Sequence, residues 1–149
     1  MKATGIVRRI DDLGRIVIPK EIRRTLRIRE GDPLEIFTDR EGKVILKKYS
    51  PIGELGSLAG IYADSLSKTL GCTVCITDTD QVIAAAGNGK KELQEMLLSA
   101  ELAEVFQERK TVLKKSSDAE FVAITKDRSE YSEEIISVIL SGGDIAGGV

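Results

Sequence analysis

The sequence contains no histidine and only two cysteines among its 149 residues. Because histidine is the commonest general base and a frequent metal ligand, its absence argues against most hydrolytic and metal-dependent chemistry. Cys72 and Cys75 form a lone C-x-x-C, whereas a structural zinc site needs four ligands and a redox motif needs its first cysteine at a helix N-terminus. We therefore expect two buried, reduced thiols, no catalytic residue, no metal site and no cofactor, and we do not expect an enzyme.

The sequence also lacks a long apolar run, because no segment approaches the roughly 18 consecutive apolar residues of a membrane span. A secretory signal is not expected either, since Ile6 and Val7 run directly into Arg8 and Arg9. With 42% hydrophobic and 31% charged residues, the composition is typical of a soluble globular protein. We expect a cytoplasmic location and no membrane partner.

The charges are unevenly distributed along the chain. Residues 1–50 hold 13 lysines and arginines against 8 acidic residues, a net charge of +5, and residues 51–149 hold 9 against 16, a net charge of -7. A basic first part and an acidic second part suggest that only the first part meets a polyanion. Chance clustering of solvated charges is the alternative explanation.

The first 50 residues predict a small unit with the order β-β-α-β-β. Alternation over residues 4–10 and the β-branched run at residues 15–18 predict two strands, joined by a tight turn at residues 11–14. Pro19 predicts the start of a short helix in which Ile22 and Leu26 face a core, and the basic side chains of this helix face the other way. Two further strands are predicted at residues 34–38 and 43–48, separated by a four-residue loop that ends in glycine.

A unit of this size buries only about 60% of its unfolded surface and is marginal without a disulfide, a metal or a partner. The first two are not expected here, which leaves oligomerisation. A dimer that exchanges its hairpins would pair the open strand edges and form one shared core. It would also bring two copies of every arginine to one surface.

The stretch TGIVRRIDDLGRIVIPKEIRRTLRI, with its G-R-[IV]-V-I-P core and trailing R-R-T-L, resembles the swapped-hairpin DNA-binding domain of the AbrB family of bacterial transition-state regulators. The resemblance covers essentially all of residues 1–50. It implies a domain-swapped β-barrel or hairpin dimer that binds double-stranded DNA, with a loose preference set by DNA shape and A/T-richness. It also implies a set of DNA-binding residues, namely Arg8, Arg15, Arg23 and Arg24, with Lys2, Arg9 and Lys20 as helpers.

Arginine chemistry agrees with this role. A guanidinium can bind guanine edges or phosphates with two parallel hydrogen bonds and cannot lose its proton, whereas lysine acts mainly as a point charge. With few base contacts, specificity depends on groove width and deformability. The alternative for each arginine is a solvated charge near Asp11, Asp12 or Glu21.

Residues 51–53 are predicted to form a linker between the first domain and a second domain at residues 54–149, since Pro51 ends the preceding strand and Gly53 allows a bend. Residues 54–70 predict a helix that ends at Gly71. Its apolar stripe consists of Leu55, Leu58, Ala59, Tyr62 and Leu66. Such a stripe belongs either to a domain core or to a dimer interface.

The remaining residues predict helices packed beside an antiparallel sheet, so the fold class is α+β. Strands are predicted at residues 72–77, 82–87, 120–125, 135–140 and 144–149. Residues 90–110 are predicted to be helical, with a break at Ser99 and Ala100. This order of elements resembles a GAF domain, a fold that senses small molecules.

Taken together, the two parts resemble transcription factors of endospore-forming bacilli that join an AbrB-type head to a GAF-like domain and form tetramers. The resemblance implies a nucleoid-associated homotetramer that activates and represses sporulation genes. Because the chain ends in DIAGGV, within an apolar strand, we expect the GAF-like domain to be incomplete and the chain to be truncated.

The sequence indicates no ligand for the GAF-like domain. Gly87-Asn88-Gly89-Lys90 offers backbone donors near a helix start, as an anion site would, but an ordinary turn is the simpler interpretation. The alternative function for the whole chain is that of an AbrB-like antitoxin, whose tail wraps a protein partner. Such tails tend to be short and disordered, whereas residues 54–149 carry the periodicity of a packed domain.

Overall fold

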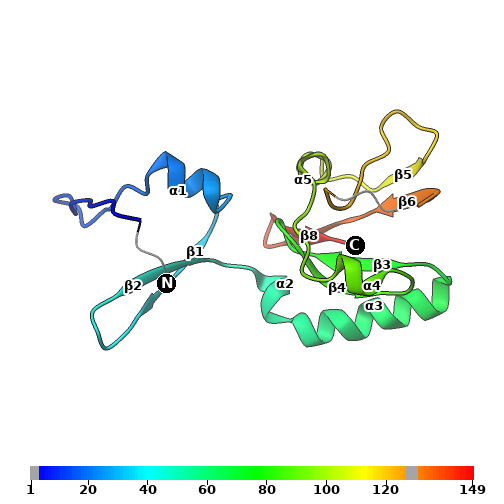
Figure 1. Ribbon diagram of the computed structural model, residues 1–149, viewed down its shortest axis with the longest axis horizontal. Helices are drawn as coiled ribbons and strands as arrows, with labels where there is room; N and C mark the ends of the chain where they lie inside the picture. The colour runs from blue at the N-terminus through cyan, green and yellow to red at the C-terminus, as the bar shows by residue number, and fades with distance from the viewer. Residues whose placement is uncertain (1–3, 127–130) are drawn as a thin grey trace. The chain divides into compact units, whose positions relative to one another are not determined.

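The computed structural model describes residues 4–126 and 131–149, and the chain divides into two compact units, Met1–Tyr49 and Ser50–Val149 (Figure 1). In the described residues, the first unit contains one short helix and a two-stranded hairpin. The second unit contains helices packed against a four-stranded antiparallel sheet. The fold is therefore mixed α+β.

The first unit begins with a segment, residues 4–19, that contains no helix or strand. The strands predicted at residues 4–10 and 15–18 are therefore wrong for the single chain. The turn predicted between them is present, because the Asp11 N–H donates to the Arg15 carbonyl over 3.0 Å. A strand needs a paired neighbour and a face to bury, but Val7 is 87% exposed and the described residues of one chain supply no ladder partner here.

Helix α1 spans Lys20–Thr25 and begins directly after Pro19, which serves as its N-cap residue. The predicted helix start is confirmed. Ile22 is half-buried, but Leu26 is 55% exposed, so the prediction that both residues face a core is wrong for Leu26. Leu26 lies at the C-cap, and the single chain offers it no apolar surface that would cover it.

Strands β1 (Leu34–Thr38) and β2 (Val44–Lys48) form an antiparallel hairpin that is paired along its whole length. The Asp39 side chain closes the connecting loop by accepting a hydrogen bond from the Lys43 N–H over 2.8 Å. This hairpin confirms the strands predicted at residues 34–38 and 43–48.

The described part of the second unit starts with helices α2 (Pro51–Glu54) and α3 (Gly56–Leu70). The other elements are β3 (Val74–Thr77), β4 (Val82–Ala86), α4 (Lys90–Leu93), α5 (Ala100–Gln107), β5 (Val112–Lys115), β6 (Glu133–Ile136), β7 (Val138–Ser141) and β8 (Asp144–Gly148). The sheet has the strand order β4-β3-β8-β7, and β5 and β6 form a separate two-stranded ladder. Helix α3 packs against β3 and β4, and α5 packs against β8 (Figure 1).

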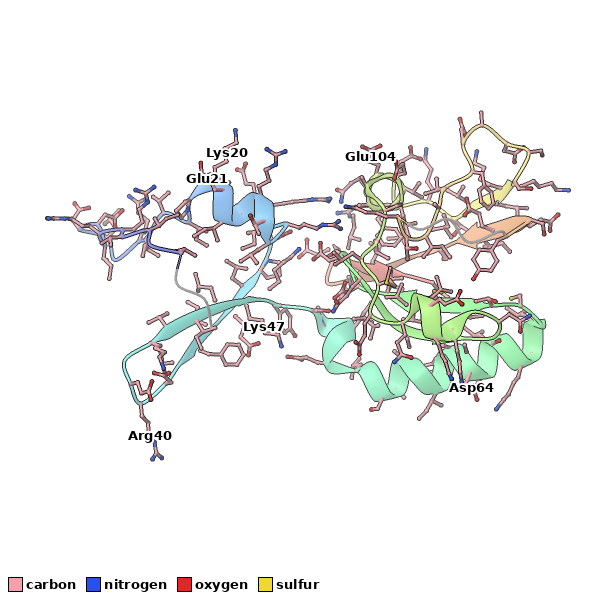
Figure 2. The ribbon with its side chains drawn as sticks, in the orientation of Figure 1. Lys20, Glu21, Arg40, Lys47, Asp64 and Glu104 are labelled. Carbon is pink, nitrogen blue, oxygen red and sulfur yellow. The ribbon has the colours of Figure 1, made fainter. Side chains whose placement is uncertain are left out.

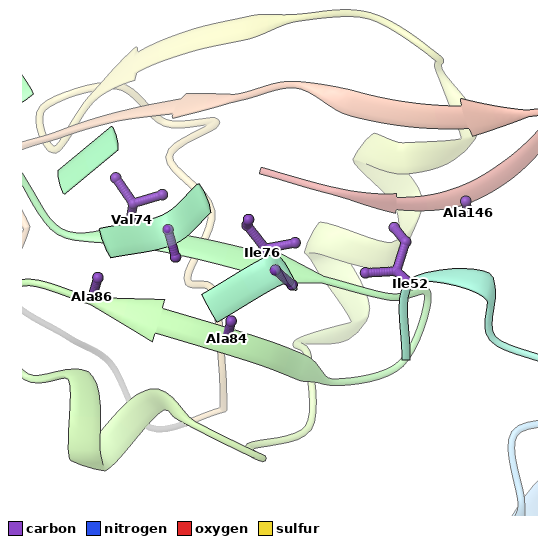
Figure 3. Close-up of a cluster of buried hydrophobic side chains, with 8 residues drawn as sticks. Ile52, Val74, Ile76, Ala84, Ala86 and Ala146 are labelled. Atoms are coloured by element: carbon purple, nitrogen blue, oxygen red, sulfur yellow. The ribbon is translucent and has the colours of Figure 1, made fainter. Parts of the chain in front are cut away.

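Two clusters of buried side chains hold this unit together. The cluster beneath α3 joins Ala59 and Ala63 to strand residues and to the preceding helix, with the members Ile52, Val74, Ile76, Ala84, Ala86 and Ala146 (Figure 3). The second cluster lies around α5 and consists of Val82, Leu98, Leu102, Phe106 and Ile136. Both faces of the sheet are thus covered, because successive strand side chains point to opposite faces.

The helix predictions for the second unit are largely confirmed. Helix α3 ends at Gly71, whose φ of 70° is the left-handed conformation that favours glycine. The helical stretch predicted at residues 90–110 is two helices, α4 and α5. The break is wider than predicted, because residues 94–99 are not helical, and the Ser99 hydroxyl accepts a hydrogen bond from the Leu102 N–H over 3.0 Å and caps α5. No helix in the described part of the chain is both long and apolar enough to cross a bilayer.

The strand predictions for the second unit need three corrections. Residues 120–125 form no strand, and only Thr125 makes an isolated bridge, to Leu98. The strand predicted at residues 135–140 is divided at Ser137, because β6 pairs with β5 and β7 pairs with β8. Strand β5 was not predicted, since Val112–Lys115 has two apolar residues followed by two lysines and shows no clear alternation.

The junction between the two units is fixed on both sides. The Tyr49 N–H donates to the Pro33 carbonyl over 3.0 Å, within the first unit. The Ser50 hydroxyl donates to the Asp78 carboxylate over 3.0 Å, within the second unit. The residues predicted as a linker, 51–53, form helix α2, whose N-cap is Ser50.

Asp78 is the centre of this anchor, and its removal should destabilise the second unit. Its carboxylate is buried and also accepts hydrogen bonds from the Asp80 and Gln81 N–H groups, both over 2.8 Å. We predict that Asp78→Ala lowers the free energy of unfolding by about 2–3 kcal/mol, because these donors lose a charged acceptor. Urea unfolding of the full chain, followed by circular dichroism, measures the change.

Asp144→Ala is the matched control for this prediction. Asp144 is an exposed carboxylate of the same unit, so its replacement should change the free energy of unfolding by less than about 0.5 kcal/mol. Equal effects of the two substitutions would contradict an anchoring role for Asp78.

Candidate nucleic-acid interface

The predicted DNA-binding residues lie in the first unit. Those that the structure describes are all exposed, and they are Arg8, Arg9, Arg15, Lys20, Arg23 and Arg24. Lys2 lies outside the described residues. The set occupies two parts of the unit, the segment before α1 and α1 itself.

Arg15 is positioned by the turn that precedes it. The Asp11 carboxylate accepts hydrogen bonds from the Arg15 backbone N–H and from its guanidinium Nε, both over 2.8 Å. These two bonds hold the pKa of the Asp11 carboxyl below its usual range, and the bond from the backbone N–H has the larger effect. The Arg15 side chain remains 70% exposed. A fixed, exposed guanidinium can donate hydrogen bonds to a phosphate or a base edge.

Helix α1 presents a second group of cations. Lys20, Arg23 and Arg24 are three and four residues apart, so they lie on one side of the helix. Figure 2 shows the Lys20 side chain directed away from strands β1 and β2. Glu21 is the acidic residue in the first turn of the helix, and the net charge of the three cations and Glu21 is positive.

One chain does not join these two groups into a continuous surface. Among the described residues, the backbone hydrogen bonds within residues 4–18 stay inside the turn at residues 11–15, apart from a local bond to the Thr4 hydroxyl. Arg8 and Arg9 therefore lie on a segment that no ladder connects to α1. Pro19 is the one described residue of the first unit that is buried, so the unit has almost no core of its own.

Other cations of the first unit have structural partners. The Lys48 ammonium donates to the Arg27 carbonyl over 3.2 Å and pairs with Asp32 over 3.2 Å. Lys43 pairs with Asp39 over 3.3 Å. Neither lysine belongs to the predicted DNA-binding set, and the Arg27 carbonyl that Lys48 contacts lies 21 positions away in the chain.

Arg40 is an exposed cation that the sequence did not single out. It lies in the loop between β1 and β2, and Figure 2 shows its side chain pointing to the opposite side of the unit from Lys20. Lys20 and Arg40 therefore lie on different faces of the first unit. This opposition makes Arg40 a useful reference in experiments on the predicted set.

The two cysteines of the second unit do not form a reactive pair. Both are free, but Cys72 is exposed, so the expectation of two buried thiols is wrong for this residue, which lies before the start of β3. Cys75 is half-buried, and burial raises its pKa to about 11. A thiol with so high a pKa is a weak nucleophile at neutral pH. In the described part of the chain, no group of three His, Cys, Asp or Glu residues is placed to hold a metal ion.

Residues 87–90 form an ordinary turn. The Asn88 carbonyl accepts a hydrogen bond from the Thr73 hydroxyl over 3.0 Å, and the Gly89 carbonyl accepts one from the Glu92 N–H over 3.0 Å. Gly89 adopts a φ of 74°, which explains the glycine at this position. The following helix, α4, has only four residues.

The chain matches known proteins over its whole length. Residues 54–149 match the family described as "Stage V sporulation protein T C-terminal, transcription factor", and residues 7–54 match the family described as "Antidote-toxin recognition MazE, bacterial antitoxin". The chain is 55% identical to stage V sporulation protein T of Bacillus subtilis over 100% of its own length and 83% of that protein.

The first third of the chain has further relatives. It is 67% identical over 51 residues to the transition state regulatory protein AbrB of Bacillus subtilis, which covers 34% of this chain and 52% of AbrB. The solution structure of the N-domain of the transcription factor AbrB has the same 67% identity and covers 34% of this chain and 96% of that domain, with a TM-score of 0.32. The chain belongs to the family of stage V sporulation protein T, which is a family of transcription factors and not of enzymes.

Proposed function

We propose that this chain is a DNA-binding transcription regulator of sporulation genes, which acts as both activator and repressor and binds DNA through an arginine-rich dimeric head. The observation that carries the proposal is the exposed cation set on the first unit, in a stretch that is 67% identical to AbrB. The solved N-terminal domain of AbrB is described as a DNA recognition domain.

The distribution of charge supports this assignment. The first 50 residues carry a net charge of +5 and the remainder a net charge of -7. Phosphate contacts made by lysine and arginine provide most of the free energy of sequence-independent DNA binding. The acidic second unit would be repelled by DNA, so the first unit alone provides the binding surface.

The first unit supports a proposal of dimerisation by hairpin exchange. Among its described residues, large apolar side chains such as Val7, Ile10 and Val17 are exposed, and only Pro19 is buried. A second chain that paired with residues 4–18 would form the missing ladders and cover these side chains. It would also align two copies of the Arg15 group and of the α1 group.

Helix α3 supports a proposal of further assembly into a homotetramer. Its buried side is formed by Ala59 and Ala63, whereas Leu58, Tyr62 and Leu66 are exposed. Apolar residues that recur at spacings of three and four on an exposed helix face are typical of a helix-helix interface. The stripe predicted to be either core or interface thus faces outwards along most of its length.

The DNA preference and the role of the second unit complete the proposal. With few cations available for base edges, specificity would depend on groove shape and deformability, which favours A/T-rich sites. The second unit, with helices on an antiparallel sheet, is proposed to be a GAF-like domain that holds two heads together and responds to a small molecule.

A protein partner is the alternative, and the match of residues 7–54 to a bacterial antitoxin family favours it. An antitoxin would use the same small unit beside a tail that wraps a toxin. Here the larger second unit is packed around two apolar clusters, which favours the first proposal.

Removal of single arginines tests the interface. We predict that Arg15→Ala or Arg23→Ala weakens binding to A/T-rich duplex DNA by about 1–3 kcal/mol, if the guanidinium contacts a base edge. Gel-shift titration measures this loss, with the oligomeric state checked by ultracentrifugation. Arg40→Ala is the matched control, since Arg40 points to the opposite face, and it should bind nearly as tightly as the unmodified chain (Figure 2). A variant of Arg15 or Arg23 with unchanged affinity would remove that residue from the interface.

Salt dependence distinguishes DNA from a protein partner. If the oligomer neutralises roughly 6–10 phosphates, affinity for DNA should fall by about 10³–10⁵ between 50 and 200 mM salt, because bound counterions are released. Fluorescence anisotropy with labelled duplex DNA measures the slope. A flat response would argue for the antitoxin-like alternative.

A charge on the exposed face of α3 tests assembly. We predict that Tyr62→Lys converts the tetramer into a dimer in sedimentation experiments, because a charge buried in an apolar interface has no partner. Ser57→Lys, which adds the same charge at an exposed polar position of α3, should leave the tetramer intact. A tetrameric Tyr62→Lys chain would show that another surface joins the dimers.

A further inference from the structure

The second unit contains a cavity of about 410 Å³ among its described residues. It lies between strand β3, helix α5 and the ladder of β5 and β6, and all of its lining residues belong to this unit. Small-molecule sites typically have volumes of about 300–1,000 Å³. The cavity is therefore large enough for a compact organic ligand.

The walls of the cavity are mainly apolar. They include Leu70 at the end of α3, Leu102 and Phe106 of α5, and Ile124, Ile136 and Leu113 from the region of β5 and β6. On the side of the sheet the residues are small, such as Cys75, Thr77 and Gly148, which leaves the space open. Phe106 packs directly on Gly148, where a Cβ atom would lie 2.6 Å from the ring.

The polar side chains on the sheet side of the cavity, Thr77 and Cys75, are uncharged, and the Thr77 hydroxyl is already hydrogen-bonded. The Thr77 hydroxyl accepts a hydrogen bond from the Gly148 N–H over 3.2 Å. Burial raises the pKa of Cys75 to about 11, so its thiol carries no charge at neutral pH. This side of the cavity offers an uncharged surface to a ligand.

The charged groups among the described lining residues are two carboxylates, Glu133 and Glu134. Glu133 pairs with Lys115 over 3.5 Å. Glu134 alternates with it, so it lies on the same face as Ile136, which is buried. Its Oε1 accepts a hydrogen bond from the Val122 N–H over 2.8 Å, and partial burial raises the pKa of its carboxyl.

This arrangement selects among ligand classes. A phosphate or carboxylate in the cavity would face Glu134, and none of the described lining residues is a lysine or arginine. Lys114, the cation opposite Glu134 in the ladder, is bonded to Glu120, and its charge also acts to lower the pKa of the Glu134 carboxyl against the larger effect of burial. A ligand that carried an ammonium group would give Glu134 a charge-assisted partner, while its apolar body filled the rest of the space.

We propose that this cavity binds a small, largely apolar amine, with the ammonium group directed at Glu134. The inference rests on the proposed response of the second unit to a small molecule and names the class of that molecule. It assigns a ligand class to the unit and disfavours nucleotides and other anionic ligands.

Three probes with one apolar body test the proposal in the full chain. They are 4-phenylbutylamine, 4-phenylbutanol and 4-phenylbutyrate, each titrated by isothermal calorimetry without DNA. The amine should bind about 10–100-fold more tightly than the alcohol, the range expected for a hydrogen bond to a charged group, and the carboxylate most weakly. Equal affinities, a preference for the carboxylate, or no binding of any probe would overturn the proposal.

Two variants separate the local carboxylate from the general acidity of the unit. Glu134→Gln should remove most of the preference for the amine while binding of the alcohol is unchanged. Glu104→Gln is the matched control, because Glu104 is an exposed carboxylate of α5 outside the cavity, and it should retain the preference (Figure 2). Equal preference in both variants would overturn the role of Glu134.

The location of the bound probe can be measured without a substitution. Nuclear Overhauser contacts between the phenyl ring of 4-phenylbutylamine and the Phe106 ring should appear in the unmodified chain. Cys75→Met should lower the affinity for all three probes several-fold, because the longer side chain fills part of the cavity. Contacts confined to residues outside the lining would overturn the assignment of the site. Since no DNA is present, failure of these tests leaves the proposed DNA binding unaffected.

Discussion

The first unit cannot bury its apolar side chains within one chain, and this constraint shapes the rest of the molecule. Residues 4–18 alternate as strands do, yet they form no ladder in the described chain, and Val7 and Val17 remain open to solvent. Backbone groups in water lose little by staying unpaired, but exposed valines and isoleucines gain from any surface that covers them. In the proposed dimer, a second copy would supply both the ladder and the cover, so one cause would provide the core and double the cations.

The cations depend on the same backbone. Arg15 is held by Asp11 through the turn, and Lys20, Arg23 and Arg24 are held on α1 by the helix that Pro19 starts. The cost of ordering long side chains falls when part of each is already fixed. Clustered charges of one sign also repel, which the nearby Asp11 and Glu21 offset in the absence of DNA. The unit thus holds clustered positive charge that a bound polyanion would stabilise.

The sequence predicted elements that local chemistry determines. The hairpin of β1 and β2, the start of α1 after Pro19 and the end of α3 at Gly71 each depend on residues close together in the chain. The prediction from sequence failed where an element depends on residues that are distant in the chain or belong to another chain. The division of β6 from β7 at Ser137 follows from which strand each one pairs with, and the exposure of Leu26 follows from a core that one chain does not complete. The roles proposed for the arginines came from resemblance, whereas the position of Glu134 beside the cavity needed the structure.

Each of the two residues at the boundary between the units is anchored in its own unit. Tyr49 is tied to Pro33 in the first unit and Ser50 to Asp78 in the second, so anchored residues are adjacent in the chain. The boundary therefore contains no long flexible linker, because both of its residues are hydrogen-bonded within their own unit. Asp78 directly follows Thr77, which lines the cavity and bonds to Gly148. The cavity wall and the anchor of Ser50 are therefore adjacent in the chain, because Thr77 lines the cavity and Asp78 accepts the hydrogen bond from the Ser50 hydroxyl.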